Sequence, residues 1–335
     1  MTRRILIAGG GVVGSTLAVT LARAGARVTL ADPVAPGANA SGVAAGMLAP
    51  VFESLFDPGA DDVERLLAAR DLWPNFAASV GISLDRTGAV AVGSDDDLDD
   101  WAARLSDAGL AAARLSPAAA RARLPGLADG LGGLGTGGDW RLDPIAALGA
   151  LRAAGQALGI RRLSLAVTAF AGGRAMTDTG DVIDADALII ATGASRSLSG
   201  IAPELTGLTP IKGHILRAPD LIFAGPTVRF AGGYVCPDPA GAIIGATMEA
   251  GRSDPAIDPA QIERVRDAAA RVLPAIARAR LTASAGVRAA TADRRPMVGR
   301  SATPGVWLAV GVRRNGWLLA PTVAAAVTRE LMSAS

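Results

Sequence analysis

The sequence has very few of the residues that bind transition metals or form covalent cross-links. It contains one cysteine, Cys236, and one histidine, His214, among 335 residues. A single cysteine excludes an intramolecular disulfide and a cysteine-based zinc site, so no metal centre is expected. His214 lies in the run PIKGHIL and is predicted to be a strand histidine that is hydrogen-bonded to a neighbour.

Lysine and runs of like charge are also scarce. Lys212 is the only lysine, so arginine supplies 32 of the 33 basic residues, and the formal net charge is +2. Basic and acidic residues are interspersed, which argues against nucleic acid as a partner. Three glycines interrupt the apolar N-terminal stretch, so a strand and a turn explain it better than a signal peptide. We expect a cytoplasmic protein with no membrane partner.

Apolar residues and glycine, by contrast, are abundant. Hydrophobic residues make up 50% of the chain, charged residues only 19%, and there are 41 glycines. This composition predicts a packed globular protein, and the length suits one large domain or two interlocked domains.

The N-terminus has the pattern of a dinucleotide-binding βαβ unit. The run RILIA (4–8) predicts a buried parallel strand, and GGGVVG (9–14) follows it as a G-x-G-x-x-G motif. A helix that Gly25 closes and a second strand at 26–32 come next, and that strand ends in Asp32. Glycines let a backbone approach a pyrophosphate, and the helix N-terminus offers it free N–H groups. Asp32 is expected to accept from ribose hydroxyls.

The middle of the chain gives a coarser prediction. Strands are expected at 87–93, 163–170, 174–180, 186–194, 211–217, 227–236 and 242–247, and helices at 97–110, 116–124, 143–159 and 259–272. Ser116, Asp143 and Asp258 stand where helix N-caps are expected. The segment 309–321 is expected to end one strand and begin the last helix.

Five further stretches of the sequence resemble segments of a known protein family. The sequence resembles the D-amino-acid oxidase family of FAD-dependent oxidoreductases and, within it, the glycine oxidases of thiamine biosynthesis. The matching stretches run in the family's order and, with the N-terminal motif, span the chain from residue 4 to its end. They are ASGVAAGMLAP (40–50) followed by Glu53, IIATGA (189–194), GGYVCP (232–237) with GAIIGATME (241–249), GVRAATADRRPMVG (286–299) and GVRRNGWLLAP (311–321).

This resemblance implies an α/β fold in which two domains are interwoven. An FAD-binding Rossmann-like domain would comprise residues 1–80, 142–207 and 285–335. An α+β substrate domain built on an antiparallel sheet would comprise 81–141 and 208–284. The resemblance also implies non-covalently bound FAD. The residues implied to hold it are Gly9, Gly11, Val12, Val13, Gly14, Asp32, Ser41, Ala45, Gly46, Met47, Val167, Thr192, Gly193, Arg314, Asn315, Gly316, Trp317 and Leu318.

The resemblance further implies that Arg288, Tyr234, Met248 and Arg314 bind the substrate amino acid. A planar guanidinium suits a carboxylate because it donates two parallel hydrogen bonds. The sequence departs from the family at Val312, where a histidine is usual, and at Gly232 and Gly233, where polar residues are usual. If Arg313 points to solvent, its replacement is expected to have little effect.

The activity implied is oxidative deamination of a small amino acid, glycine or a similar amine, by hydride transfer to FAD. Imine or 2-oxo acid, ammonia and hydrogen peroxide would be the products, with oxygen as acceptor. Two alternatives stay open: a dehydrogenase that passes electrons to a quinone or carrier, and a tRNA-modifying oxidoreductase. The sequence also leaves open the exact substrate and whether the protein is a homo-oligomer.

Overall fold

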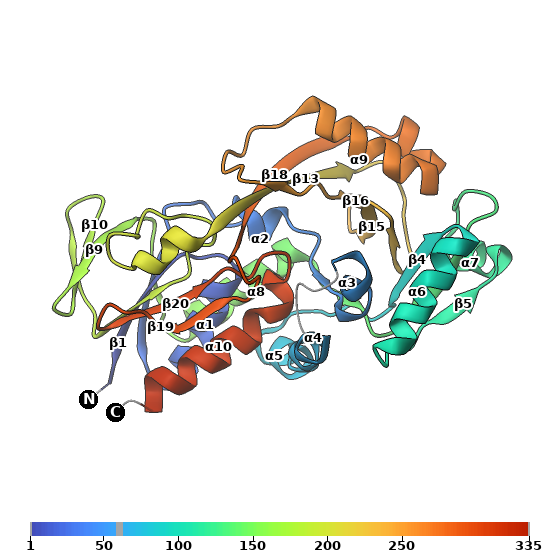
Figure 1. Cartoon of the computed structure of the whole chain (residues 1–335). Coiled ribbons are helices and arrows are strands. Elements are labelled where there is room, and N and C mark those ends of the chain that lie inside the picture. The colour runs from blue at the N-terminus through green and yellow to red at the C-terminus, as the bar shows by residue number, and fades with distance from the viewer. Residues whose placement is uncertain (1, 58–62, 334–335) are drawn as a thin grey trace.

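The structure is a computed structural model that describes residues 2–57 and 63–333. Two sheets lie side by side, with helices on their outer faces (Figure 1). The described ends of the chain lie together below the sheet that contains the first strand, β1 (Figure 1). The chain passes between the two sheets several times, so neither sheet comes from one continuous segment.

The first sheet has six strands in the order β19-β20-β12-β1-β2-β8. All neighbouring pairs are parallel except β19–β20, which is antiparallel. Its central strand reads RILIA, and the four residues after Arg4 are buried, as expected of a parallel strand covered on both faces. The strands are β1 (Arg4–Ala8), β2 (Arg27–Ala31), β8 (Arg161–Leu163), β12 (Ala187–Ile190), β19 (Met297–Arg300) and β20 (Val306–Val310).

Helices cover one face of this sheet and a small sheet covers the other. The helical layer comprises α1 (Val12–Arg23), α4 (Val63–Asp71), α5 (Trp73–Val80), α8 (Pro144–Ala157) and α10 (Gly316–Ser333). A three-stranded antiparallel sheet packs on the opposite side through a separate apolar cluster. Its strands are β9 (Val167–Ala171), β10 (Arg174–Thr177) and β11 (Val182–Asp184), and the 3-10 helix Pro203–Gly207 joins the same cluster.

The second sheet has nine strands and is mainly antiparallel. Its order is β17-β13-β16-β15-β14-β4-β6-β5, and β18 also pairs with β13. These strands are β4 (Ala89–Gly93), β5 (Ala113–Leu115), β6 (Gly132–Thr136), β13 (Thr209–Ala218), β14 (Thr227–Phe230), β15 (Gly233–Asp238), β16 (Gly241–Gly245), β17 (Glu249–Ala250) and β18 (Thr282–Ala290). Helices α6 (Asp95–Asp107), α7 (Pro117–Arg123) and α9 (Pro259–Val272), with the 3-10 helix Pro274–Arg278, pack against it.

Short elements join the two sheets. They are α2 (Ala40–Val43), α3 (Pro50–Phe56) and the two-stranded pair of β3 (Met47–Leu48) with β7 (Trp140–Arg141). The α/β class and the separate antiparallel sheet are therefore as predicted. The domain boundaries at 81, 142, 208 and 285 stay a prediction, and β18 crosses the last of them.

Most predicted elements are present, with one clear exception. The expected strand at 227–236 is two strands, β14 and β15, because Gly232 turns the chain with φ +91°. The N-caps predicted at Ser116, Asp143 and Asp258 are confirmed by side-chain hydrogen bonds to the first helical turns. In the part of the chain that the structure describes, no helix is long and apolar enough to cross a membrane.

Candidate active site

The glycine motif forms a tight turn between β1 and α1. Gly9 has φ +108°, and a Cβ there would lie 2.3 Å from the carbonyl oxygen of Ala191. A Cβ on Gly14 would lie 1.9 Å from the carbonyl oxygen of Gly9. Only glycine fits at either position, so the helix starts directly against the strand. Its N-cap residue is Gly11, which has no side chain to cover the helix end.

Asp32 supports this turn from the end of β2. Its Oδ2 accepts from the Gly10 N–H at 2.5 Å, and its Oδ1 accepts from the Val34 N–H at 2.8 Å. The sequence predicted hydrogen bonds from ribose hydroxyls to this carboxylate. The structure adds a second role, because the same carboxylate fixes the glycine turn. The ribose contact stays a prediction.

A cavity of about 210 Å³ opens at the N-terminus of α1. A helix N-terminus whose N-cap residue has no side chain, beside a wall of glycine backbone, fits the pyrophosphate of a dinucleotide. Ser41 forms part of this wall, and its Oγ accepts from the Val12 N–H at 3.0 Å. The predicted cofactor residues that line the cavity are Gly9, Gly11, Val12, Val13, Ser41, Thr192, Gly193, Arg314, Gly316 and Trp317. We call it the nucleotide cavity.

A second cavity, of about 310 Å³, adjoins the first. Four residues line both: Ala44, Arg288, Arg314 and Trp317. Ala45, Gly46, Met47 and Asn315, also predicted to hold the cofactor, line this second cavity. The remaining predicted cofactor residues, Gly14, Asp32, Val167 and Leu318, line neither, and their contacts with a cofactor stay predictions. We call the second space the substrate cavity.

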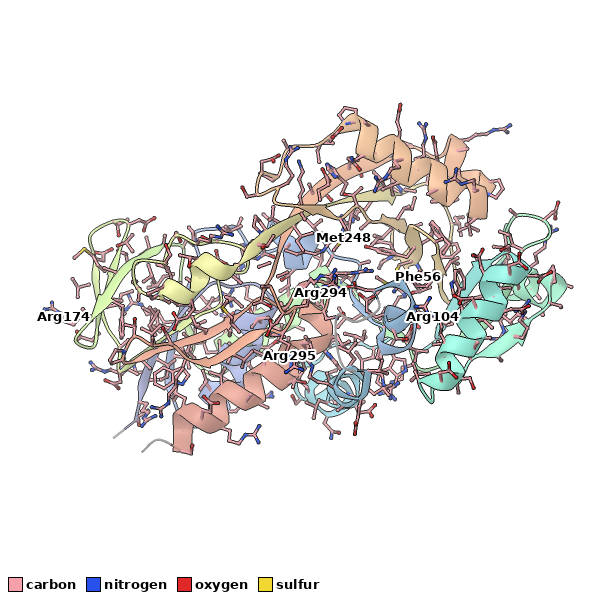
Figure 2. All side chains as sticks on the ribbon, in the orientation of Figure 1. Phe56, Arg104, Arg174, Met248, Arg294 and Arg295 are labelled. Atoms are coloured by element: carbon pink, nitrogen blue, oxygen red, sulfur yellow. The ribbon has the colours of Figure 1, made fainter. Side chains whose placement is uncertain are left out.

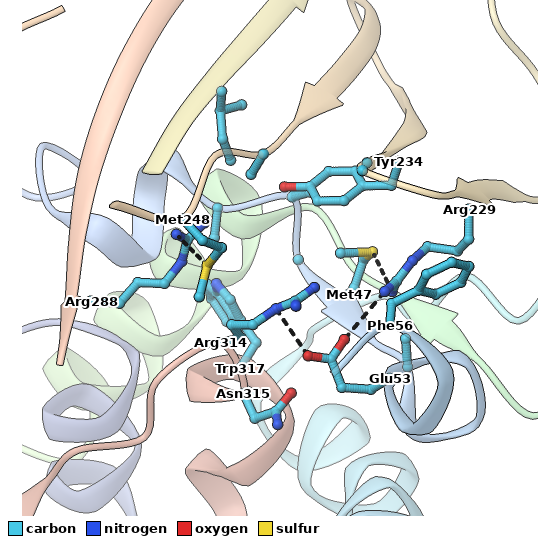
Figure 3. A pocket seen from close by; sticks show the side chains of 18 of the residues that line it. Met47, Glu53, Phe56, Arg229, Tyr234, Met248, Arg288, Arg314, Asn315 and Trp317 are labelled. Atoms are coloured by element: carbon cyan, nitrogen blue, oxygen red, sulfur yellow. Dashed lines mark hydrogen bonds and ion pairs between the residues drawn. The ribbon is translucent and has the colours of Figure 1, made fainter. Parts of the chain in front are cut away.

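The structure brings all four predicted substrate residues into the substrate cavity (Figure 3). Arg288 comes from β18, Tyr234 from β15, Met248 from the loop after β16 and Arg314 from the loop before α10. They are up to 80 residues apart in the sequence. Their roles as substrate contacts stay predictions, but their convergence on one space supports those roles.

The guanidinium of Arg288 lies in the substrate cavity close to a carbonyl oxygen and a sulfur atom. Its Nη1 is 3.4 Å from the carbonyl oxygen of Thr247 and 3.5 Å from the Met248 sulfur (Figure 3). It forms no ion pair with any acidic residue that the structure describes. Burial lowers its pKa, and the nearby Arg314 lowers it further. Gly213 makes room for the group, because a Cβ there would lie 2.1 Å from Nη1.

Tyr234 closes the cavity on the side of the second sheet. The residue is 6% exposed, and its ring fills the space over Gly245, where a Cβ would lie 2.5 Å from the phenol oxygen. Burial raises the pKa of Tyr234 to about 12. The phenol therefore stays protonated at neutral pH and keeps an O–H to donate.

Glu53 links two arginines in the cavity wall. Its Oε1 lies 2.9 Å from Nε of Arg314, and its Oε2 lies 3.3 Å from Nη2 of Arg229 (Figure 3). The sequence predicted that a flavin or substrate anion meets Arg314, and the structure places this protein carboxylate there. Arg229 is 1% exposed and lies over the ring of Phe56 at 5.0 Å.

Arg229 was missed by the sequence reasoning. It stands in the strand TVRF between apolar residues, and that setting was the one signal in the sequence that could have indicated a buried arginine. Arg313 also needs a correction, because its side chain is only 15% exposed and forms an ion pair with Asp57. It does not point to solvent, so its replacement would break a buried ion pair rather than have little effect.

Asp139 holds the helix that carries Glu53. It lies between β6 and β7, is 2% exposed, and accepts from the N–H groups of Val51 and Phe52 at 2.7 and 3.0 Å. These bonds fix the start of α3. Burial outweighs them and raises the pKa of Asp139 to about 6.

Asp139 is expected to make the fold less stable as the pH rises. Its pKa of about 6 exceeds the ordinary 3.8, so the folded protein holds this proton more tightly than the unfolded chain. The stabilisation is complete below about pH 4 and is lost as the pH rises through about 6, a loss of about 3 kcal/mol. Urea unfolding across this range should show it, and Asp139→Asn should flatten that part of the profile. Identical profiles for the two proteins would refute the assignment.

The lone histidine and cysteine stand outside both cavities. His214 is buried on β13, where Nδ1 lies 2.9 Å from Oε1 of Glu249 and Nε2 accepts from the Asp258 N–H at 3.1 Å. The prediction of a strand histidine bonded to its neighbours is confirmed. Cys236 is buried, and burial raises its thiol pKa to about 11.

Comparison with known proteins gives a consistent family assignment. The model of the family described as FAD dependent oxidoreductase matches residues 4–330. Glycine oxidase of Geobacillus kaustophilus is 29% identical over 96% of this chain and 91% of that protein. A crystal structure of glycine oxidase from the same species has a TM-score of 0.85 and 26% identity, covering 99% of this chain and 95% of that one.

Two further relatives carry other names. A putative thiamine biosynthesis oxidoreductase, ThiO, of Rhizobium etli is 33% identical over 98% of this chain and 97% of that protein. A bifunctional tRNA 5-methylaminomethyl-2-thiouridine biosynthesis protein, MnmC, of Caulobacter is 27% identical over 99% of this chain. The chain spans only 55% of that longer protein.

Proposed function

The chain belongs to the family of FAD dependent oxidoreductases, and from this premise we propose that it oxidises a small amino acid, glycine or a similar amine, with oxygen as the electron acceptor. FAD is the cofactor. The names of the relatives support amine oxidation, with glycine oxidation for thiamine synthesis as its most specific form. The products would be the imine or 2-oxo acid, ammonia and hydrogen peroxide.

One observation carries the proposal: a guanidinium with no acidic partner among the described residues lies where the two cavities meet. Arg288 lines both the nucleotide cavity and the substrate cavity. A substrate carboxylate bound there through two parallel N–H bonds would hold the amino acid between them. The substrate would then lie beside the nucleotide cavity, whose residues would hold the cofactor.

The neighbouring side chains support the same orientation. The protonated phenol of Tyr234 can donate to a carboxylate, and Met248 forms an apolar wall. FAD, when bound, supplies the electron acceptor for the Cα–H bond, so the protein needs chiefly to orient the substrate and exclude water. We propose non-covalent binding, since Cys236 and His214 line neither cavity. We also propose that the protein is located in the cytoplasm.

A peroxide assay of the purified yellow protein tests this function. Glycine, sarcosine, and D- and L-amino acids should be offered in parallel, once with oxygen and once with an artificial dye as acceptor. Peroxide formation from a small amino acid is the expected result. Turnover with the dye alone would favour a dehydrogenase, and no turnover with either acceptor would contradict the proposal.

A tRNA-modifying activity is a second candidate because of the Caulobacter relative. Binding of RNA would depend on neutralising phosphates, so its affinity would fall steeply with salt. Titration with tRNA at two salt concentrations therefore tests this candidate. Salt-sensitive binding would support it, and no binding at low salt would remove it.

Met248 is expected to limit the size of the substrate side chain. Met248→Gly should shift the preference from glycine towards larger amino acids, because one or two methylenes of pocket space change discrimination by about 1–3 kcal/mol. The ranking of kcat/KM over an amino-acid series measures the effect. Met248→Leu preserves the volume and should keep the original ranking. An unchanged ranking in Met248→Gly would remove this residue from the substrate site.

A further inference from the structure

The substrate cavity carries more positive charge than one amino-acid carboxylate balances. Its charged lining consists of four arginines and one glutamate: Arg229, Arg264, Arg288, Arg314 and Glu53. Glu53 is already shared between two of these arginines, at 2.9 and 3.3 Å. Asp57, a further acid near Arg314, lies outside the lining and pairs with Arg313. Two guanidinium groups of the wall, Arg288 and Arg264, have no anionic partner among the residues that the structure describes.

Arg264 is the second of these groups and comes from a different element. It lies on α9, is exposed, and makes no hydrogen bond or ion pair with any residue that the structure describes. Its neighbour Arg266, by contrast, is 3.1 Å from Asp267. Arg264 lines the cavity although its helix packs against the far face of the second sheet. The arginine therefore lies at the rim, where water still reaches it.

The cavity wall that includes Arg264 also contains two adjacent glycines. Gly232 and Gly233 line the same cavity, and they stand where the sequence departs from the family pattern by lacking polar side chains. A Cβ added at Gly232 would have no atom within 4 Å. At Gly233, by contrast, a Cβ would lie 2.6 Å from the carbonyl oxygen of Gly245. The wall is therefore open at Gly232, where a substituent on the substrate would find space.

The two arginines without an anionic partner among the described residues indicate how many anionic groups the substrate should carry. On the basis of the function proposed above, Arg288 takes the α-carboxylate, and a reacting amine is neutral because its lone pair forms the imine. Glycine therefore leaves Arg264 without an anion. We propose that the preferred substrate is a small amino acid that carries a second anionic group, on its side chain or on its nitrogen, and that Arg264 selects for this group.

Matched substrate pairs test this inference. The FAD-loaded enzyme should be assayed with aspartate against asparagine, N-(carboxymethyl)glycine against N-ethylglycine, and phosphoserine against serine, using both enantiomers where they exist. The first two pairs place a carboxylate on the side chain or on the nitrogen, and the third offers a phosphate. We expect the acidic member of at least one pair to have a kcat/KM about twofold to fivefold higher than its uncharged partner, as for a solvent-exposed ion pair.

Arg264→Ala should remove that preference, with a much larger fall in kcat/KM for the acidic substrate than for glycine. Arg266→Ala is the matched control, because it removes an arginine from the same helix that does not line the cavity. The control variant should keep the preference. The inference is overturned if no acidic member is preferred, or if the preference survives in Arg264→Ala.

A binding measurement separates this inference from the proposed oxidation. Succinate and acetate should be titrated against the yellow protein, and the change in flavin absorbance gives each dissociation constant. Succinate should bind about twofold to fivefold more tightly than acetate in the wild type, but equally in Arg264→Ala. If no amino acid is oxidised but this difference appears, the oxidase proposal fails and the second anion site stands. If glycine is oxidised and the difference is absent, the oxidase proposal stands and the second anion site is refuted.

Discussion

Arg288→Ala is expected to lower kcat/KM for amino acids by about 30-fold to several thousand-fold, because losing one partner of a desolvated charge pair costs about 2–5 kcal/mol. The guanidinium is partly buried and has no protein carboxylate beside it among the described residues, so we propose the substrate carboxylate as its counterion. FAD content should be unchanged. Arg288→Lys keeps the charge but not the two-pronged geometry, and should recover only part of the activity.

The control for Arg288→Ala should be an exposed arginine that lies far from both cavities. Arg313 is unsuitable because it pairs with Asp57, whereas Arg174 lies on β10 at the far edge of the molecule and its side chain is 68% exposed (Figure 2). Arg174→Ala should keep full activity. Amines that lack a carboxylate should be poor substrates for the wild type and indifferent to Arg288→Ala. An active Arg288→Ala enzyme would place the carboxylate on another arginine.

Gly11→Val is expected to yield folded but colourless protein. A Cβ at this position would lie 3.1 Å from Ser41 Oγ, the acceptor of the Val12 N–H, and the two methyl groups would extend into the nucleotide cavity. They would occupy the space that a pyrophosphate needs at the start of α1. Flavin released by acid precipitation, per mole of protein, measures the loss, and circular dichroism checks the fold.

A matched substitution tests whether a valine side chain elsewhere in the protein also lowers the flavin content. Gly149 is exposed in α8, and a Cβ there would have no atom within 4 Å. Gly149→Val introduces the same side chain away from both cavities and should leave the protein fully yellow. If Gly11→Val also keeps its full flavin content, the cofactor lies elsewhere and the nucleotide cavity has been misassigned.

Features that depend on residues close together in the sequence could be predicted from it. The turn from β1 into α1 follows from Gly14, because a Cβ there would strike the carbonyl oxygen of Gly9. The caps at Ser116, Asp143 and Asp258 follow from one side chain that accepts from N–H groups two or three residues later. Such interactions are local, so their signal is contained in a short stretch of sequence.

The charge pairs of the cavity wall could not be predicted in this way. Glu53 and Arg229 are 176 residues apart and meet only because α3 and β14 converge beside the substrate cavity. The pairing of β14 with β4 is also distant in the sequence, since Thr227 lies opposite Ala89. No periodicity in either segment indicates its partner. The family resemblance named Arg288 and Tyr234, but it did not identify the protein carboxylate that meets Arg314.

The most direct test of the central claim is the anaerobic reduction of the bound FAD by an amino acid. We predict that glycine or another small amino acid bleaches the yellow wild-type protein without oxygen, that Arg288→Ala bleaches far more slowly, and that admitting oxygen restores the colour with release of peroxide. The account would be contradicted if the wild type stays yellow with every amino acid while dithionite bleaches it. It would equally be contradicted if wild type and Arg288→Ala are bleached at the same rate.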